Sequence, residues 1–323
     1  MLVLECHIEI SGTKIVKFDY VTEIAVKSSI NSFTGTAKIT VPRKLRFEGK
    51  SLPDYINIGD SVKISMGYKK HAIQTVFEGY IKSVSSTTPI VIECEDEAYK
   101  LKLKRVDNEY TDNFSLNYFA RKYCGEYTSV MSDLELGVMR IWNKSVAEVF
   151  EYLASNYPVH FFFREGKLYG ESYDDILTPQ NTITLAYGSN IISDTLQYLE
   201  GDKVKVAVKA KVMTSGNKML EYVTPSEAQS GGYDVKTFYY PSAKSVSDLK
   251  ALADKQLEGL RVNSMKGSVT TFGIPFVRPG DTVVLSDNVN IERDGKKFRI
   301  DAIEYKFSKG GYRQTIYPGK EIQ

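Results

Sequence analysis

Four acidic residues stand close together near the end of a predicted strand, and carboxylates at this spacing could do chemistry. They surround Cys94 and are Glu93, Glu95, Asp96 and Glu97. Such a group could bind a metal ion through its oxygens or supply the acid and base of a glycosidase. Strand alternation favours a plainer interpretation, in which Glu93 and Glu95 share the solvent face opposite Ile92 and Cys94, and Asp96 caps a helix.

Histidines and cysteines, the other residues that commonly carry chemistry, are few. The three histidines are far apart in the sequence, and we expect each to be structural or solvated: His7, His71 and His160. The three cysteines lack C-x-x-C spacing and are expected to be reduced thiols: Cys6, Cys94 and Cys124. No metalloprotease, phosphate-loop, dinucleotide or nucleophile-elbow motif occurs. The sequence therefore predicts a protein that is not an enzyme, with no catalytic, cofactor-binding or metal-binding residues.

Two lysine pairs, Lys69-Lys70 and Lys296-Lys297, allow two interpretations. Exposed lysines protect strands from unwanted pairing. Alternatively, these lysines could face a channel that carries nucleic acid. The net charge of +2 gives little support to a dedicated nucleic-acid or membrane-surface binder, so we favour the first interpretation.

The elements that must position these residues centre on the stretch 58–96. A Gly59-Asp60 turn precedes an alternating strand pattern at 61–65, which a polar interval separates from a returning strand at 76–84. A third strand at 90–94 completes an antiparallel meander. This order of turn, strand, reversal and strand is typical of a β-module.

A second copy of this pattern stands near the end of the chain. Five residues recur at a constant offset of 221 positions: Gly59, Asp60, Val62, Ile64 and Phe77 match Gly280, Asp281, Val283, Leu285 and Phe298. A Gly-Asp pair before a strand is common, but five matches without a gap are not. We therefore predict two related β-modules, an internal duplication too long in period for a solenoid.

The bulk composition is that of a soluble globular protein with two or three domains in 323 residues. Tyr and Phe are plentiful, with 22 and 15 copies, which suits strand-rich structure. The N-terminus lacks the pattern of a signal peptide, and no apolar stretch approaches the ~20 residues of a membrane span. We expect a protein made in a cytoplasm without a signal peptide.

The fold class that follows is mainly β with an α/β insert. Residues 1–105 are predicted to form a first β-barrel module, 106–180 a small helix-and-hairpin domain, and 181–323 a second β-barrel module that includes one helix at about 247–260. A capping box at Ser145–Glu148 starts a helix in the insert, and a hairpin turns at Glu165-Gly166. The polar, glycine-bearing stretch 213–232 is expected to be a long loop or a disordered tip.

The order of these motifs resembles a known family over nearly the whole chain. The runs at 59–64, 77–81 and 90–96, the Leu/Ala-rich helix, the second Gly-Asp strand and the ending at 298–313 are similar to baseplate hub proteins of contractile-tailed phages. These form the late control protein D group, which resembles the N-terminal hub part of type VI secretion spike proteins. No single motif is diagnostic, but their order is.

The resemblance implies a structural function. In that family three subunits, each with two related barrels, close a pseudo-sixfold ring that adapts a hexameric tail tube to a trimeric spike. The expected partners are two further copies of the chain, the tail tube protein, a separate spike protein and other baseplate proteins, and the expected location is the virion tail. Larger relatives continue into an oligonucleotide-binding-fold domain and a needle, whereas this sequence stops at Gln323.

Two alternatives stay open at the level of sequence. A carbohydrate-active or carbohydrate-binding protein would need paired carboxylates in an aromatic cleft, for which only Glu93, Glu95 and Asp96 are candidates. A hub component of a type VI secretion-like spike would share the fold, although the absence of a spike extension argues weakly against it.

Overall fold

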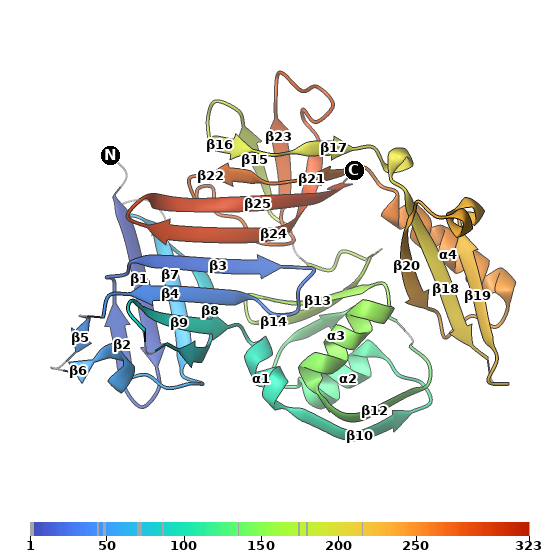
Figure 1. Ribbon diagram of the computed structural model, residues 1–323, viewed down its shortest axis with the longest axis horizontal. Coiled ribbons are helices and arrows are strands. Elements are labelled where there is room, and N and C mark those ends of the chain that lie inside the picture. The colour runs from blue at the N-terminus through green and yellow to red at the C-terminus, as the bar shows by residue number, and fades with distance from the viewer. Residues whose placement is uncertain are drawn as a thin grey trace. The chain divides into compact units, whose positions relative to one another are not determined.

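The computed structural model describes residues 3–43, 45–47, 50–69, 73–85, 87–134, 136–173, 175–178, 180–214 and 216–322. The chain is mainly β, with several sheets and few helices (Figure 1), which confirms the predicted fold class. It forms two compact units, each assembled from segments that are distant in sequence. Among the described residues, no helix is both long and apolar enough to cross a membrane.

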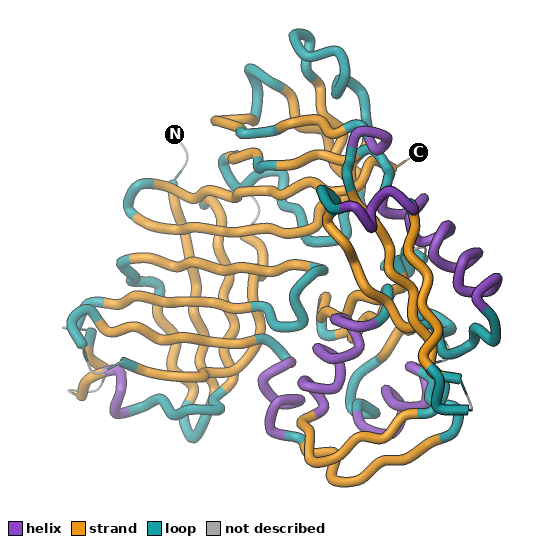
Figure 2. The backbone as a smooth tube through the Cα atoms, turned by 45° about the vertical axis from the view of Figure 1, so that its right-hand side comes forward, coloured by secondary structure: helices purple, strands orange, loops and turns teal. Residues whose placement is uncertain are grey.

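Unit 1 comprises 1–100, 180–196 and 266–322 and is built on one long antiparallel path of strands. The path runs β16-β22-β25-β24-β3-β4-β9-β8-β7-β1-β2, and β23 adds to β24 and β15 to β23. The long strands lie side by side in Figure 2. Their bounds are β1 Leu4–Ser11, β2 Ile15–Phe18, β3 Glu23–Ser29, β4 Thr36–Val41, β7 Ser61–Tyr68, β8 Ile73–Val84, β9 Ile90–Glu95, β15 Thr182–Ala186, β16 Ile191–Asp194, β22 Val269–Thr271, β23 Thr282–Ser286, β24 Lys297–Ser308 and β25 Gly311–Ile322.

The core of unit 1 follows from strand alternation. In β1 the side chains Cys6, Ile8 and Ile10 are each at most 2% exposed, while the residues between them face outward. Tyr68 and Tyr312 join strands from the two ends of the chain, with ring centroids 5.9 Å apart. The Tyr68 hydroxyl donates to the Phe272 carbonyl at 2.6 Å. Burial of such rings supplies much of the stabilisation of a sheet core.

The two predicted barrels are not closed within the described part of this chain. The first and second halves instead share a sheet, because β24 pairs antiparallel with β3 from Ala302–Ser29 to Ser308–Glu23. Each half therefore uses a strand edge to join the other half, and the path ends in β2 and β16. A short ribbon of β5 (Arg46–Phe47) and β6 (Lys50–Ser51), followed by η1 (Leu52–Asp54), comes between β4 and β7 in the chain.

Unit 2 comprises 101–179 and 197–265 and holds most of the helical residues. Its first part contains α2 (Leu116–Tyr123) and α3 (Val146–Asn156), a ribbon of β10 (Arg105–Thr111) and β12 (Met139–Ser145), and a sheet of β11 (Ser129–Met131), β14 (Lys167–Ser172) and β13 (Val159–Arg164). The short helix α1 (Ala98–Leu103) begins at the end of unit 1.

The predicted capping box of α3 is confirmed. Ser145 Oγ accepts the Glu148 amide at 3.1 Å, and the Glu148 carboxylate accepts the Ser145 amide at 2.6 Å. These bonds lower the pKa of Glu148. The predicted hairpin is also present, with Glu165 and Gly166 at φ of 53° and 73° between β13 and β14. Such positive values at both turn residues match the twist of the paired strands.

The second part of unit 2 corrects the sequence prediction for 213–232. This stretch contains β19 (Met219–Thr224), antiparallel to β18 (Val206–Met213), and η3 (Ser226–Ser230). The stretch was predicted to be a loop because it is polar. In the structure, charged side chains help to stabilise β19 against β18, since Glu221 pairs with Lys209 at 2.8 Å and with Lys211 at 3.0 Å. Leu220 and Tyr222 pack against the core of this part.

The remaining elements complete that part of unit 2. Strand β20 (Asp234–Tyr239) runs parallel to β18. Helix α4 (Val246–Leu260), predicted at about 247–260, buries Leu249, Ala253 and Leu257 against the β18–β20 sheet. Three short elements are η2 (Gly201–Lys203), β17 (Gln197–Leu199) and β21 (Ser264–Lys266), the last lying at the boundary of the units.

Candidate functional site

The feature of unit 1 that carries the predicted duplication is the turn before β7. Gly59 has φ of 92°, a conformation that favours glycine. Its amide donates to the Ile81 carbonyl at 2.8 Å, and the Ile81 amide donates to the Asp60 carbonyl at 2.9 Å. The Asp60 carboxylate accepts the Asn57 amide at 2.7 Å, and the Asp60 amide donates to the Asn57 carbonyl at 3.2 Å. The turn is thus fixed to the returning strand β8.

The turn before β23 repeats these four hydrogen bonds. Gly280 has φ of 89°, its amide donates to the Ile300 carbonyl at 2.8 Å, and the Ile300 amide donates to the Asp281 carbonyl at 2.8 Å. The Asp281 carboxylate accepts the Arg278 amide at 2.8 Å, and the Asp281 amide donates to the Arg278 carbonyl at 3.1 Å. Both returning strands then carry a bulge, after Ile81 and after Ile300. The two turns are the same local structure.

Strand register corrects one of the five matched residues. Val62 lies opposite Gly79, and Val283, its counterpart, lies opposite Phe298. Phe298 is therefore the counterpart of Gly79 and not of Phe77. The chain between the paired residues Val283 and Phe298 is two residues shorter than the chain between Val62 and Gly79. A sequence match without a gap is therefore out of register by two residues after the reversal.

The two copies differ in their surroundings. Asp281 is only 2% exposed and accepts a further amide hydrogen from Asn181 at 3.2 Å, whereas Asp60 is partly exposed. The strand beside β7 is β1 and runs antiparallel to it, while the strand beside β23 is β15 and runs parallel. The modules therefore share their turns but have different edges.

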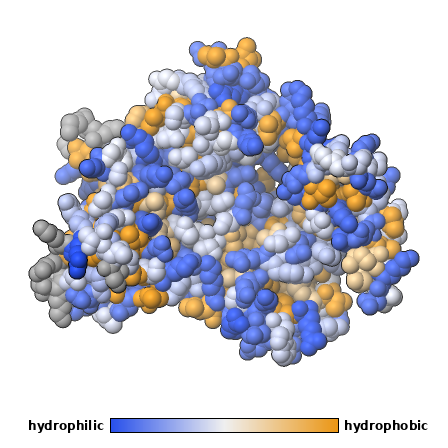
Figure 3. Space-filling model, in the orientation of Figure 1, coloured by the Kyte–Doolittle hydropathy of each residue, from blue (hydrophilic) through white to orange (hydrophobic). Residues whose placement is uncertain are grey.

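The interval between β23 and β24 is a loop with a rigid base and an apolar tip. The Asp287 carboxylate, 1% exposed, accepts the amides of Val289 and Asn290 and pairs with Arg293 Nε at 2.7 Å. These bonds lower the pKa of Asp287 although burial opposes the charge. Val289 and Ile291 at the tip are 79% and 81% exposed, and apolar atoms are visible at this tip in Figure 3. Such exposure of two β-branched side chains marks a candidate contact surface.

The acidic cluster is divided between different local contacts. Glu93 is exposed and accepts the Ser83 hydroxyl at 2.9 Å, as the solvent-face interpretation requires. Asp96 accepts the Ala98 amide at 3.0 Å at the start of α1, which confirms its capping role. The prediction for Glu95 was wrong, since this residue is 4% exposed and pairs with Lys82 Nζ at 2.6 Å. Glu93 has partners in the same two flanking strands, β4 and β8, and stays exposed, so the ion pair with Lys82 is what sets Glu95 apart.

Two of the three histidines are described, and each has a contact of its own. His7 contacts Glu5 at 3.3 Å, and the His160 ring lies 4.4 Å from the ring of Tyr173. His71 lies outside the described residues. Burial raises the pKa of each thiol to about 12, which leaves all three protonated at neutral pH: Cys6, Cys94 and Cys124. Within the described ranges, no group of three or more His, Cys, Asp or Glu side chains could hold a metal ion.

The predicted lysine pairs are only partly described. Lys69 is exposed at the end of β7, and Lys70 lies outside the described residues. Lys296 approaches Glu321 at 3.6 Å, and Lys297 is exposed at the start of β24. Lys296 thus has an acidic neighbour of its own, in keeping with a strand-protecting lysine.

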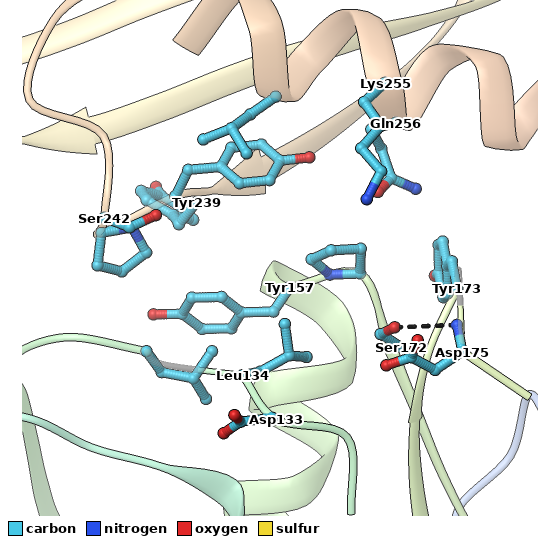
Figure 4. A pocket seen from close by; sticks show the side chains of 15 residues that line it. Asp133, Leu134, Tyr157, Ser172, Tyr173, Asp175, Tyr239, Ser242, Lys255 and Gln256 are labelled. Carbon is cyan, nitrogen blue, oxygen red and sulfur yellow. Dashed lines mark hydrogen bonds between the residues drawn. The ribbon is translucent and has the colours of Figure 1, made fainter. Parts of the chain in front are cut away.

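A pocket in unit 2 was not predicted from the sequence. It has a volume of about 500 Å³ and lies between α3 and the end of β14 on one side and the end of β20 and α4 on the other (Figure 4). Its residues come from five separate stretches, so no local motif marks it. The lining residues are Asp133, Leu134, Leu136, Tyr157, Pro158, Ser172, Tyr173, Asp175, Tyr239, Tyr240, Pro241, Ser242, Leu252, Lys255 and Gln256.

Comparison with known proteins relates the whole fold to phage tails. The chain is similar to a tail protein from Neisseria meningitidis MC58, with a TM-score of 0.68, 14% identity and coverage of 98% of this chain and 97% of that chain. It is similar to a 43 kDa tail protein of prophage MuSo2 from Shewanella oneidensis, with a TM-score of 0.63, 15% identity and 97% coverage of both chains. An Escherichia coli component of the type VI secretion system, described as structurally similar to bacteriophage T4 tail proteins, gives a TM-score of 0.60 at 13% identity and covers 98% and 77%.

Comparisons of sequence alone give one partial match. A family model described as the Alg8 N-terminal domain matches residues 1–117, which is about a third of the chain. No curated protein matches. The identities to the solved structures are low, so these likenesses establish a shared fold of the phage tail and type VI secretion type.

Proposed function

We propose that the chain is a structural hub of a phage tail baseplate or a related contractile injection machine. Three copies would form a ring, and the two related modules of each copy would present six similar positions around it. Such a ring would adapt a hexameric tail tube to a trimeric spike made by another polypeptide. The protein would then be a virion component of the late control protein D type, with other baseplate proteins as neighbours.

The observation that carries this proposal is the repeated turn. Two segments far apart in the sequence have four equivalent hydrogen bonds each, the same glycine conformation and the same bulge in the returning strand. A threefold particle can offer a sixfold surface only if each subunit carries the recurring element twice. The different edges of the modules, β1 beside one and β15 beside the other, would keep the particle threefold elsewhere.

The tail proteins with the same fold support a structural function over an enzymatic one. They also favour it over the carbohydrate-active alternative, for which Glu93, Glu95 and Asp96 were the candidates. Of these, Glu93 and Glu95 are engaged with Ser83 and Lys82, and Glu95 is buried. We therefore propose no catalytic step for this chain.

Sedimentation velocity of the purified chain, alone and with the tail tube subunit, tests the proposal. The expected result is a species of three chains that binds the tube subunit. A chain that stays monomeric in the presence of both the tube and the spike proteins would contradict it.

One variant pair locates a contact. Ile291→Asp places a charge at the apolar tip and is expected to weaken the association with a partner. Glu292→Gln changes the adjacent exposed residue without adding a charge to that tip and should leave the association unchanged. Equal behaviour of the two variants would exclude the tip from the interface.

A further inference from the structure

The pocket of unit 2 contains a buried donor without a protein partner. Gln256, on α4, is 4% exposed, and its Nε2 has no hydrogen-bond partner in the described part of the chain. In Figure 4 its side chain points from α4 toward the space between the two walls. An unpaired buried amide costs about 1–3 kcal/mol, so a ligand that offers an acceptor at this position would recover that free energy.

Aromatic and proline side chains form the walls of the pocket. Tyr157 and Tyr239 come from opposite sides, as Figure 4 shows, and Pro158 and Pro241 lie beside them. Tyr157 is 7% exposed, and burial raises its pKa to about 12, so its hydroxyl stays neutral. Rings facing each other across a gap favour an occupant with flat apolar faces.

The rim of the pocket is polar and slightly acidic. Asp133 and Asp175 are exposed carboxylates, and Lys255 is the exposed cation among the lining residues. The net charge at the rim is therefore negative, which disfavours phosphate and other anions. A basic residue beside the apolar part of an occupant would fit this rim.

The two walls are held together at one close approach. Gly137, with φ of 69°, lies against Pro241, and a Cβ at this glycine would stand 2.5 Å from the proline Cβ. The Gly137 carbonyl accepts the Phe114 amide at 2.7 Å. The pocket is thus a built feature of unit 2.

We infer that this pocket binds an extended, proline-rich segment of a partner protein, next to a basic residue of that segment. Prolines have no amide hydrogen, so such a segment presents only carbonyl acceptors, one of which would accept the Gln256 Nε2 hydrogen. Its pyrrolidine rings would lie between Tyr157 and Tyr239, the mode by which aromatic grooves bind polyproline II helices. The volume of about 500 Å³ is in the range of binding pockets.

This inference goes beyond the proposed hub, because it concerns unit 2 alone and requires neither the trimer nor the tube. Fluorescence anisotropy of the full chain with a labelled proline-rich peptide that ends in arginine tests it. The expected result is saturable binding, weakened about fivefold by Gln256→Leu and at least about tenfold by Tyr239→Ala. Tyr152→Ala removes a tyrosine on α3 that is 54% exposed and outside the lining, and it should bind like the wild type.

Thermal unfolding separates a ligand-binding Gln256 from a merely structural one. Replacing an unpaired buried amide by leucine removes its desolvation cost, so Gln256→Leu should unfold at the same or a higher temperature than the wild type. Three results would overturn the inference: no binding of the peptide, binding that Gln256→Leu and Tyr239→Ala leave unchanged, or loss of stability in Gln256→Leu. Binding of a neutral disaccharide such as maltose in place of the peptide would also overturn it.

Discussion

The two related turns make a paired prediction, because the same substitution in each should have different costs. Asp60→Ala removes a carboxylate that accepts the Asn57 amide at a partly exposed position. Water can replace that bond, so we expect a loss of about 1 kcal/mol, as for a helix cap. Asp281→Ala removes a buried carboxylate and leaves the amides of Arg278 and Asn181 without it. Both bonds are only partly buried, so at the lower end of about 1–3 kcal/mol for each unpaired donor we expect a loss of about 2 kcal/mol.

Urea unfolding followed by far-ultraviolet circular dichroism measures this difference. The single tryptophan, Trp142, lies on β12 in unit 2, so its fluorescence reports the other unit and serves as an internal reference. A larger loss for Asp60→Ala than for Asp281→Ala, or no loss for either, would refute the assignment of the two carboxylates as equivalent turn acceptors in different environments.

Three further predictions concern other parts of the chain. Asp287→Ala should destabilise unit 1 by about 2–3 kcal/mol in urea unfolding, since it removes the nearer of the two acidic partners of the buried Arg293 and leaves only Asp194, while Glu292→Ala in the same loop should have no effect. Glu109 is held by Lys122, Tyr123 and Tyr118, which lower its pKa below the unfolded value. Its stabilising effect is therefore present above about pH 4.3 and lost as the pH falls through the folded pKa, so the wild type should lose its advantage over Glu109→Gln in acid melts. The cysteines should not react with Ellman's reagent at pH 8 until the chain unfolds, and fast reaction of the native protein would contradict the burial of these three: Cys6, Cys94 and Cys124.

Local signals in the sequence predicted local structure well. The capping box at Ser145, the hairpin turn at Glu165-Gly166 and the Gly-Asp turns depend on backbone conformation and neighbouring amides, which short motifs encode. The helix at 246–260 follows from the spacing of its apolar residues.

Features that depend on distant partners could not be predicted. Glu95 looks like a solvent-face residue by alternation, but it is buried and pairs with Lys82, which stands 13 residues earlier in the chain. Strand β19 is polar in sequence and is stabilised by β18, which the stretch 213–232 does not itself contain. The pairing of β24 with β3 likewise joins residues as far apart as Ser308 and Glu23, so the sequence predicted two β-barrel modules but not the sheet that the two halves share.

The pocket shows the same limit for sites. Tyr157 comes directly before Pro158, and Tyr239 comes two residues before Pro241. In the sequence, each of these stretches resembles the usual end of a helix or strand. Only the folded unit 2 brings them to Gln256 of α4. The one feature that the sequence could have offered is a glutamine on the apolar side of a helix, next to Leu257 and near Ala253.

Electron cryomicroscopy of the chain assembled with its tube subunit tests the central claim most directly. We predict a ring of three subunits in which the turns at Gly59 and Gly280 alternate at nearly equal radius and about 60° apart around the axis, as six similar positions on a threefold particle require. A ring in which these turns lie at clearly different radii or heights, or an assembly without a threefold axis, would contradict the claim.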